Sequence, residues 1–181
     1  MQYACCIGKG RLGTGMKILE TERLLLYPLT TKDADFMLML MNEPGFIKYV
    51  ADRGLRTSAD AADYISQKII PSYARFGFGL YRVDLKESKT AIGICGLVKR
   101  DTLEEVDIGF SILQRFCGKG YAYEAAAAVM RYGRNVLGLP RIVGVTAPDN
   151  RASIHLLEKL GLKRQRKIHL PGYGPESLLF G

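Results

Sequence analysis

The sequence predicts a mixed α/β fold whose sheet is largely antiparallel and contains one parallel strand pair. Three observations lead to this prediction. Residues 104–137 read as a strand, a glycine turn and a helix, and residues 79–99 read as two strands joined by a polar turn. Residues 141–146 form a β-branched run that is typical of a buried parallel strand. At 181 residues the chain is long enough for one domain with a substantial core.

The first elements are a strand and a capped helix. Residues 23–29 are predicted to form the strand, and residues 32–42 the helix, in which Ala34, Met37 or Leu38, and Met41 form an apolar stripe. Threonine 30 or 31 supplies the cap.

A second helix is predicted over residues 59–76, beginning after Ser58, with an interruption or kink at Pro71. Strands over residues 79–85 and 90–99 follow. The glycines at positions 93 and 96 of the latter strand indicate a bulge or a close approach of another backbone.

The central strand shows a strict alternation of side chains. Four apolar residues face one side, and the polar or small residues between them face the other: Val106, Ile108, Phe110, Ile112 against Glu105, Asp107, Gly109, Ser111. Gly118 and Gly120 then allow a tight turn. Because free N–H groups and the positive end of the dipole meet at the start of the next helix, we predict an anion site there.

The chain closes with a helix and a strand pair. Asn150 is a suitable N-cap for a helix that runs to Leu160 and ends at Gly161. Residues 162–170 and 177–180 are predicted to be the final antiparallel pair. The connection from Val106 to Thr146 should be a right-handed crossover.

Two other phosphate-binding motifs are excluded at the glycine turn. The turn has no Gly-Lys-Ser or Gly-Lys-Thr, and the spacing of its glycines is too short for a dinucleotide fingerprint. The segment from Cys117 to Ala122 resembles the phosphate loop of the GNAT N-acetyltransferases, whose pattern is Gln/Arg-x-x-Gly-x-Gly/Ala. Cys117 departs from the usual first residue. The string GKGYAYEA is most similar to the RimJ/RimL-type branch, and the Asn150–Gly161 segment is similar to a second family block.

The resemblance implies a six- to seven-stranded sheet with helices on both faces and strands splayed around acetyl-CoA. The main chain near the central strand and the loop should contact this cofactor, together with the start of the last helix. The residues implied are Phe110, Ile112, Leu113, Cys117, Gly118, Lys119, Gly120, Tyr121, Ala122, Asn150 and Ser153. No metal is implied.

Acetyl transfer to an amine needs a base, a donor to the thioester oxygen and an acid for the departing thiolate. Asp107 is the first candidate base and Glu105, predicted on the same face, is the second; a salt-bridged strand carboxylate is the alternative for both. The N–H of Phe110 or Ile112 is the candidate donor. Many family members carry a tyrosine acid where this chain has Leu157, so Ser153 becomes the candidate acid, with helix capping as its alternative role.

One segment carries the whole of the net charge of +8. Between Ile112 and His169, eleven basic residues stand against three acidic ones. Such asymmetry fits an anionic partner, for which coenzyme A suffices, although a solvated basic surface is the alternative. Nucleic acid is a weaker interpretation, because no aromatic platform for stacking bases is interleaved with the basic residues.

The four cysteines and two histidines lack zinc-ligand spacing, and reduced thiols in the cytoplasm are the simpler account. No signal peptide or membrane span is evident. Residues 1–17 are assigned to an N-terminal extension and 18–181 to a single domain. The glycines at 8, 10 and 13 match a dinucleotide fingerprint formally, but a strand rather than a helix follows them.

The predicted activity is direct acetyl transfer from acetyl-CoA to a primary amine, either a protein N-terminus or a small molecule. Phe46, Tyr49 and Val50 are candidates for the acceptor groove, with plain packing as the alternative. The alternative functions are a non-catalytic coenzyme A sensor and a basic RNA- or ribosome-binding module. A homodimer is expected from the branch, although no residue pattern specifies one.

Overall fold

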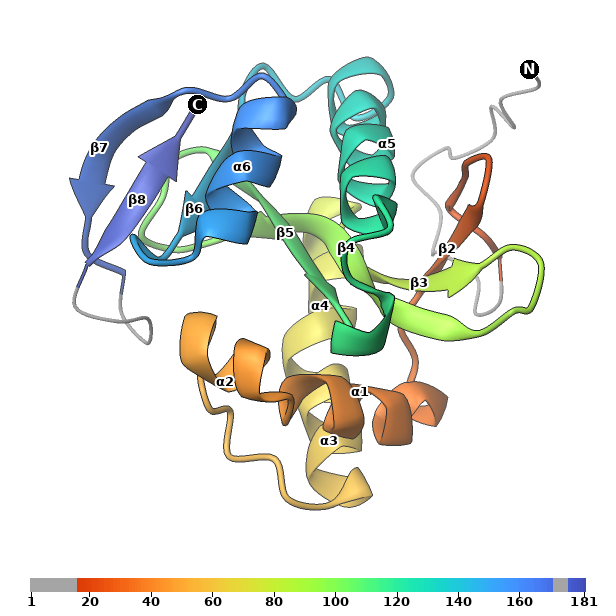
Figure 1. Ribbon diagram of the computed structural model, residues 1–181. Coiled ribbons are helices and arrows are strands. Elements are labelled where there is room, and N and C mark those ends of the chain that lie inside the picture. The colour runs from red at the N-terminus through yellow and green to blue at the C-terminus, as the bar shows by residue number, and fades with distance from the viewer. Residues whose placement is uncertain (1–15, 171–175) are drawn as a thin grey trace.

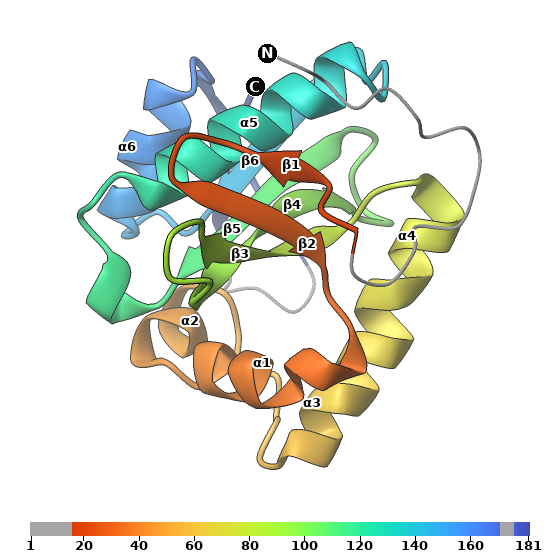
Figure 2. The same cartoon turned by 90° about the vertical axis from the view of Figure 1, so that its right-hand side faces the viewer.

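The fold is described from a computed structural model, which covers residues 16–170 and 176–181. One twisted sheet of eight strands lies between two groups of helices, α5 and α6 on one face and α1 to α4 on the other (Figures 1 and 2). The strand order is β1-β2-β3-β4-β5-β6-β8-β7. The predicted class, mixed α/β with a mostly antiparallel sheet and helices on both faces, is confirmed.

Neighbouring strands are antiparallel except for the central pair, β5 and β6. The strands are β1 (Leu19–Glu20), β2 (Leu24–Pro28), β3 (Leu80–Leu85), β4 (Ala91–Lys99), β5 (Val106–Ile112), β6 (Ile142–Thr146), β7 (Arg164–Ile168) and β8 (Ser177–Phe180). The count exceeds the expected six to seven because the chain before β2 folds back on it as the two-residue strand β1.

The helices differ from the prediction mainly in the first half of the chain. They are α1 (Ala34–Met41), α2 (Pro44–Tyr49), α3 (Ser58–Tyr64), α4 (Ile70–Phe76), α5 (Tyr121–Asn135) and α6 (Arg151–Lys159), with 3-10 turns over Thr31–Asp33 and Gln114–Phe116. Helix α2 was not predicted, because six residues are too few to show a period. The interruption expected near Pro71 is a π-helical segment, Ile65–Ile69, between α3 and α4. Proline has no N–H for an ordinary helical bond, so the helix widens there.

The core has two parts, one on each face of the sheet. Val106 and Ile108 face α5 and α6, as alternation predicts, and pack with the fully buried Ala125 and Ala126 of α5. The second part, under α1 to α4, includes Met37 and Met41. The predicted stripe of the first helix is therefore core.

Glycines allow the closest packing in the sheet. A Cβ on Gly96 would lie 2.0 Å from the carbonyl oxygen of Gly79, and one on Gly93 would lie 2.3 Å from that of Ser111. The pairing of β3 and β4 also shifts register beside Gly93. Both features expected of these glycines, a bulge and a close approach, are confirmed.

Residues 1–15, including the glycines at 8, 10 and 13, lie outside the described residues, so the boundary between extension and domain stays a prediction. Within the described part of the chain, no helix has the length and apolar character needed to cross a membrane.

Candidate active site

The candidate site lies where the parallel pair β5 and β6 separates. The two strands pair only at their amino-terminal ends, through Val106 with Ile142 and Asp107 with Val143. Beyond these residues they diverge toward their carboxyl ends, which face α1 and α2 (Figure 1). A helix follows each strand, so the amino-terminal ends of α5 and α6 flank the divergence. The starts of both helices and the edge of β5 that β6 leaves therefore border the same region.

The edge of β5 presents main-chain donors toward the divergence. The N–H of Leu113 bonds to the carbonyl of Ile92, the residue before Gly93 in β4, at 2.8 Å. Because successive amides of a strand point to opposite sides, the N–H groups of Ile112 and Phe110 point away from β4, to the side that β6 has left. This is the orientation that the role of oxyanion donor requires.

The loop before α5 has the predicted conformation. Gly118 and Gly120 both have left-handed backbones, with φ of 75° and 81°, and α5 begins at Tyr121 directly after Gly120. The first helical bond runs from Glu124 N–H to the Gly120 carbonyl. Within residues 16–170 and 176–181, no hydrogen-bond acceptor engages the N–H groups of residues 118–123. These six amides are the donors that the predicted anion site requires, and binding of an anion to them stays a prediction.

The loop is held in place by residues that the sequence did not single out. The Arg23 guanidinium bonds to Glu124 in the first turn of α5 and to the carbonyl of Lys119. On the other side, the Glu43 carboxylate accepts the N–H of Gln114 at 2.9 Å. These partners are 71 to 101 positions apart in sequence, so no local pattern could have found them.

Cys117 is exposed, and its thiol donates weakly to the carbonyls of Ile112 and Leu113, at 3.5 and 3.7 Å. Partial burial, together with the nearby Glu43 carboxylate, raises the pKa of this thiol. A raised pKa reduces the thiolate fraction, which makes an acetyl-enzyme intermediate on Cys117 unfavourable.

Asp107 is buried, with 1% of its surface exposed, and it is the last residue of β5 that pairs with β6. Its Oδ2 accepts from Arg100 Nε at 2.7 Å, and its Oδ1 accepts the main-chain N–H of Val145 at 3.2 Å. Burial raises the pKa of Asp107 to about 6, although the Arg100 charge and both hydrogen bonds oppose the rise. The salt-bridged alternative is thus present in the structure, while the pKa lies in the range useful for a general base.

Glu105 lies elsewhere. It precedes β5 at the closed end of the strand pair, where it forms an ion pair with Arg141, just before β6, at 3.3 Å. The divergence opens at the opposite end of the strands. Glu105 therefore lies farther from the opening than Asp107 and is paired with Arg141, and its role as the second candidate base stays a prediction.

At the start of α6, Asn150 is the N-cap, because its Oδ1 accepts the main-chain N–H of Ser153 at 3.1 Å. The Ser153 hydroxyl takes no part in this cap. Leu157 is fully buried, and a Cβ on Gly144 of β6 would lie 2.4 Å from it. Its position is therefore core, and an acid cannot come from it.

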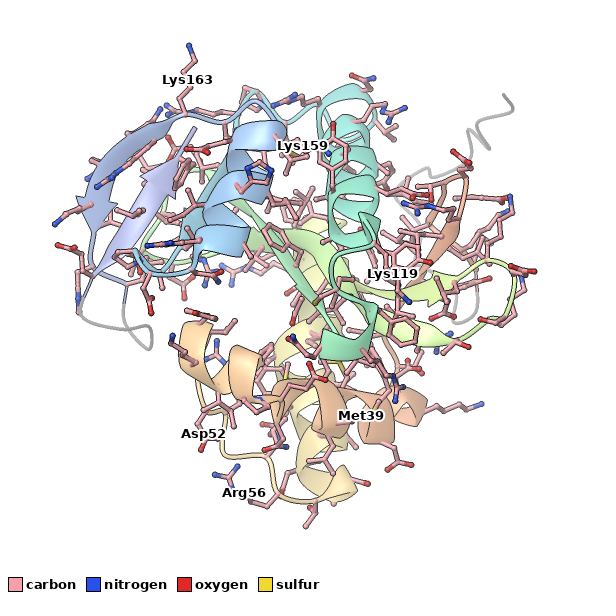
Figure 3. All side chains as sticks on the ribbon, in the orientation of Figure 1. Met39, Asp52, Arg56, Lys119, Lys159 and Lys163 are labelled. Carbon is pink, nitrogen blue, oxygen red and sulfur yellow. The ribbon has the colours of Figure 1, made fainter. Side chains whose placement is uncertain are left out.

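A hollow of about 320 Å³ lies between α5 and α6, away from the divergence. It is lined by Tyr123, Ala127, Met130, Arg131, Arg134, Asn135, Lys159 and Leu160. Figure 3 shows Lys159 reaching between the two helices and Lys119 at the loop before α5. Lys159 Nζ lies 4.4 Å from the centre of the Tyr123 ring. Of these labelled lysines, only Lys119 lies at the predicted anion site, whereas Lys159 lines the hollow and Lys163 points away from both (Figure 3).

The side of the opening that is predicted to take the acceptor is the one that α1 and α2 cover. Phe46 is buried in the second part of the core, whereas Tyr49 and Val50 are half-buried. Lys48 of α2 pairs with Asp149, before α6, at 3.2 Å. A groove role for Tyr49 and Val50 stays a prediction. Among residues 16–170 and 176–181, no group of three potential metal ligands is close enough to hold an ion.

Comparison with known proteins agrees with this geometry. The family model described as the acetyltransferase (GNAT) domain matches residues 23–163. An uncharacterized N-acetyltransferase of Bacillus subtilis, YoaA, is 30% identical over 150 residues, covering 82% of this chain and 84% of the relative. The ribosomal protein uS5-alanine N-acetyltransferase of Escherichia coli is 34% identical over 106 residues, 58% of this chain and 50% of that enzyme. An acetyltransferase crystal structure from Agrobacterium tumefaciens superposes with a TM-score of 0.75 at 27% identity, covering 96% and 98% of the two chains.

Proposed function

The chain belongs to the GNAT family of acetyltransferases, in its RimJ/RimL-like branch, and from this premise we propose that it moves the acetyl group of acetyl-CoA directly to a primary amine. The observation that carries the proposal is the row of unbonded amides at residues 118–123 beside the divergence of β5 and β6. A diphosphate on these amides leaves the thioester arm free to enter the divergence.

In the proposed complex, Gly118 and Gly120 allow the backbone to approach the diphosphate closely. Cys117, Lys119, Tyr121 and Ala122 complete this loop, in which binding depends mainly on main-chain N–H groups. The arm then passes along the edge of β5 at residues 110–113. Asn150 and Ser153 flank the arm from the start of α6.

The proposed chemistry uses three groups of this chain. The N–H of Phe110 or Ile112 stabilises the oxygen of the tetrahedral intermediate. The incoming amine loses its proton to Asp107, which, because it is buried, receives the proton through a solvent molecule. The Ser153 hydroxyl donates to the departing thiolate of coenzyme A, since the cap does not use it. No metal takes part.

The acceptor in this proposal is a primary amine, and a protein N-terminus is the first to test. The support is the relative named for alanine acetylation of ribosomal protein uS5. We place the reaction in the cytoplasm, where Cys95 and Cys117 would stay reduced; both are free thiols in the structure.

The test is to mix the protein with acetyl-CoA and a panel of amines, including alanine-initiated peptides and small polyamines, and to follow the release of free thiol. Release that depends on one acceptor supports the proposal. Binding of acetyl-CoA without turnover on any acceptor would favour a sensor instead. Salt-dependent RNA binding that coenzyme A does not displace would favour a nucleic-acid module.

A further inference from the structure

An arginine ties the phosphate loop, which follows β5, to the start of β2, three strands away in the sheet. Arg23, just before β2, donates from Nε to Glu124 Oε2 at 2.7 Å and from Nη1 to the Lys119 carbonyl at 3.1 Å. Its guanidinium also lies 4.7 Å from the centre of the Tyr121 ring. One side chain thus contacts the loop, the first residue of α5 and its first-turn carboxylate.

Glu124 in turn is fixed by three donors. Besides the Arg23 side chain, Thr21 Oγ1 donates to its Oε1 at 2.6 Å and the Arg23 main-chain N–H donates at 2.9 Å. Burial alone would raise the pKa of Glu124, but these hydrogen bonds and the Arg23 charge hold it below its ordinary value. The carboxylate therefore stays ionised at neutral pH and keeps Arg23 in one orientation.

The bond to Lys119 sets the direction of an anion-binding amide. The carbonyl of Lys119 and the N–H of Gly120 belong to one planar peptide and point in opposite directions across it. With Arg23 holding the carbonyl, the Gly120 N–H points away from Arg23. The two glycines give the loop a large conformational freedom, and ordering it costs entropy. A fixed carbonyl reduces that cost before the ligand arrives.

The same arginine also cancels a charge. Glu124 stands in the first turn of α5, where an unpaired carboxylate would repel a diphosphate bound to the amides of residues 118–123. Its side chain is 17% exposed, so solvent screens it only in part. The ion pair with Arg23 removes this repulsion.

We propose that Arg23, oriented by Glu124, is a positioning residue that pre-orders the phosphate loop for the diphosphate of coenzyme A. This inference rests on the proposed function. It assigns Arg23 to affinity rather than to the chemical step, because Arg23 acts through the Lys119 carbonyl and reaches no reacting atom.

The test begins with calorimetric titration of coenzyme A into the wild type and into the Arg23→Ala, Arg23→Lys and Glu124→Gln variants. Arg23→Ala should weaken binding about tenfold, the equivalent of one or two lost hydrogen bonds, and raise the KM for acetyl-CoA without lowering kcat. Arg23→Lys keeps the positive charge but loses the planar guanidinium with its several N–H donors. Its affinity for coenzyme A should therefore lie between that of the wild type and that of Arg23→Ala. The Arg23→Ala and Glu124→Gln effects should not add in the double variant, because the two residues act as a unit.

The matched control is Glu20→Gln. Glu20 lies in β1, which pairs with β2 close to Arg23, and it forms ion pairs with Lys17 and Lys86 rather than with the phosphate loop. It should leave coenzyme A affinity unchanged. Amide hydrogen exchange is measured without ligand at Glu124, whose N–H bonds to the Gly120 carbonyl in the first turn of α5. It should accelerate in Arg23→Ala and not in Glu20→Gln.

Wild-type affinity and wild-type exchange rates in Arg23→Ala would overturn the proposal, as would a fall in Tm with no change in either. If Arg23→Ala does not fold, the same comparison is made with Arg23→Lys and Glu124→Gln. Failure of the wild type to bind coenzyme A would instead contradict the proposed function. The exchange measurement needs no ligand, so it still shows in that case whether Arg23 orders the loop.

Discussion

The carboxylate of Asp107 accepts the main-chain N–H of Val145 at the point where β5 and β6 stop pairing. In a continuous parallel ladder, a main-chain carbonyl of β5 would accept that N–H. Here a side chain takes its place, so β6 remains hydrogen-bonded while the two backbones separate. Asp107 thus satisfies a partly buried donor at the edge of the proposed thioester site, whatever part it plays in proton transfer.

Asp107 should make the stability of the protein depend on pH. Its pKa is about 6 in the folded state against an ordinary value of 3.8, so between these values the folded protein binds the proton more tightly than the unfolded chain. The stability contributed by this group therefore falls as pH rises through that window. Asp107→Asn does not titrate. The Tm of the wild type should decrease relative to that of Asp107→Asn from about pH 4 to about pH 6. A Tm difference that is constant over this range would contradict the assignment.

Asp107→Asn should also slow turnover. Loss of the proposed base lowers kcat by ~10²–10⁴-fold, while the Kd for coenzyme A stays near the wild-type value because the phosphate loop is untouched. In the wild type, kcat/KM should rise with pH through about 6, as the carboxylate ionises. Steady-state kinetics with a confirmed acceptor, together with calorimetry, check both statements.

The control for this measurement is Glu105→Gln. Glu105 pairs with Arg141 at the closed end of the strands, so the substitution should change kcat by less than about twofold, since a partly exposed ion pair contributes little. Equal losses in the two variants would mean that the base assignment to Asp107 is wrong.

Alanine at the loop glycines should cost both stability and affinity. Gly118 and Gly120 have φ of 75° and 81°, and a left-handed backbone costs an L-residue about 1–2 kcal/mol. Either substitution should lower the free energy of unfolding by that amount and weaken coenzyme A binding. Gly45, in α2, has an ordinary φ and open space around it, so Gly45→Ala is the matched control and should be neutral or stabilising. Denaturant unfolding and calorimetry of the three variants give the comparison.

Asn150 and Ser153 should separate capping from chemistry. Asn150→Ala removes the acceptor of the Ser153 N–H and should cost about 1 kcal/mol of stability. Ser153→Ala keeps that N–H, so stability should hold while kcat at saturating acetyl-CoA falls. A Ser153→Ala enzyme with full kcat would remove the hydroxyl from the proposed mechanism.

Much of the architecture follows from local pattern. The alternation in β5 assigned Val106 and Ile108 to the core side correctly, and the glycines at 118 and 120 marked the turn that directly precedes α5, although the helix begins at Tyr121, two residues earlier than its apolar pattern indicates. Such predictions succeed because side-chain period and left-handed turns depend on a few neighbouring residues. Helix α2 and the strand β1 escaped prediction because they are too short to show a period.

The sequence by itself determined the fold class, the family and the glycine turn before α5, since each depends on residues that are close along the chain. Only the tertiary structure decided that Glu105 lies at the closed end of the strands, that Asp107 is buried against Arg100, and that Arg23 reaches Glu124 across 101 positions. Burial and ion pairing depend on which distant segments come into contact. These contacts form only when the sheet is assembled and α5 packs across it.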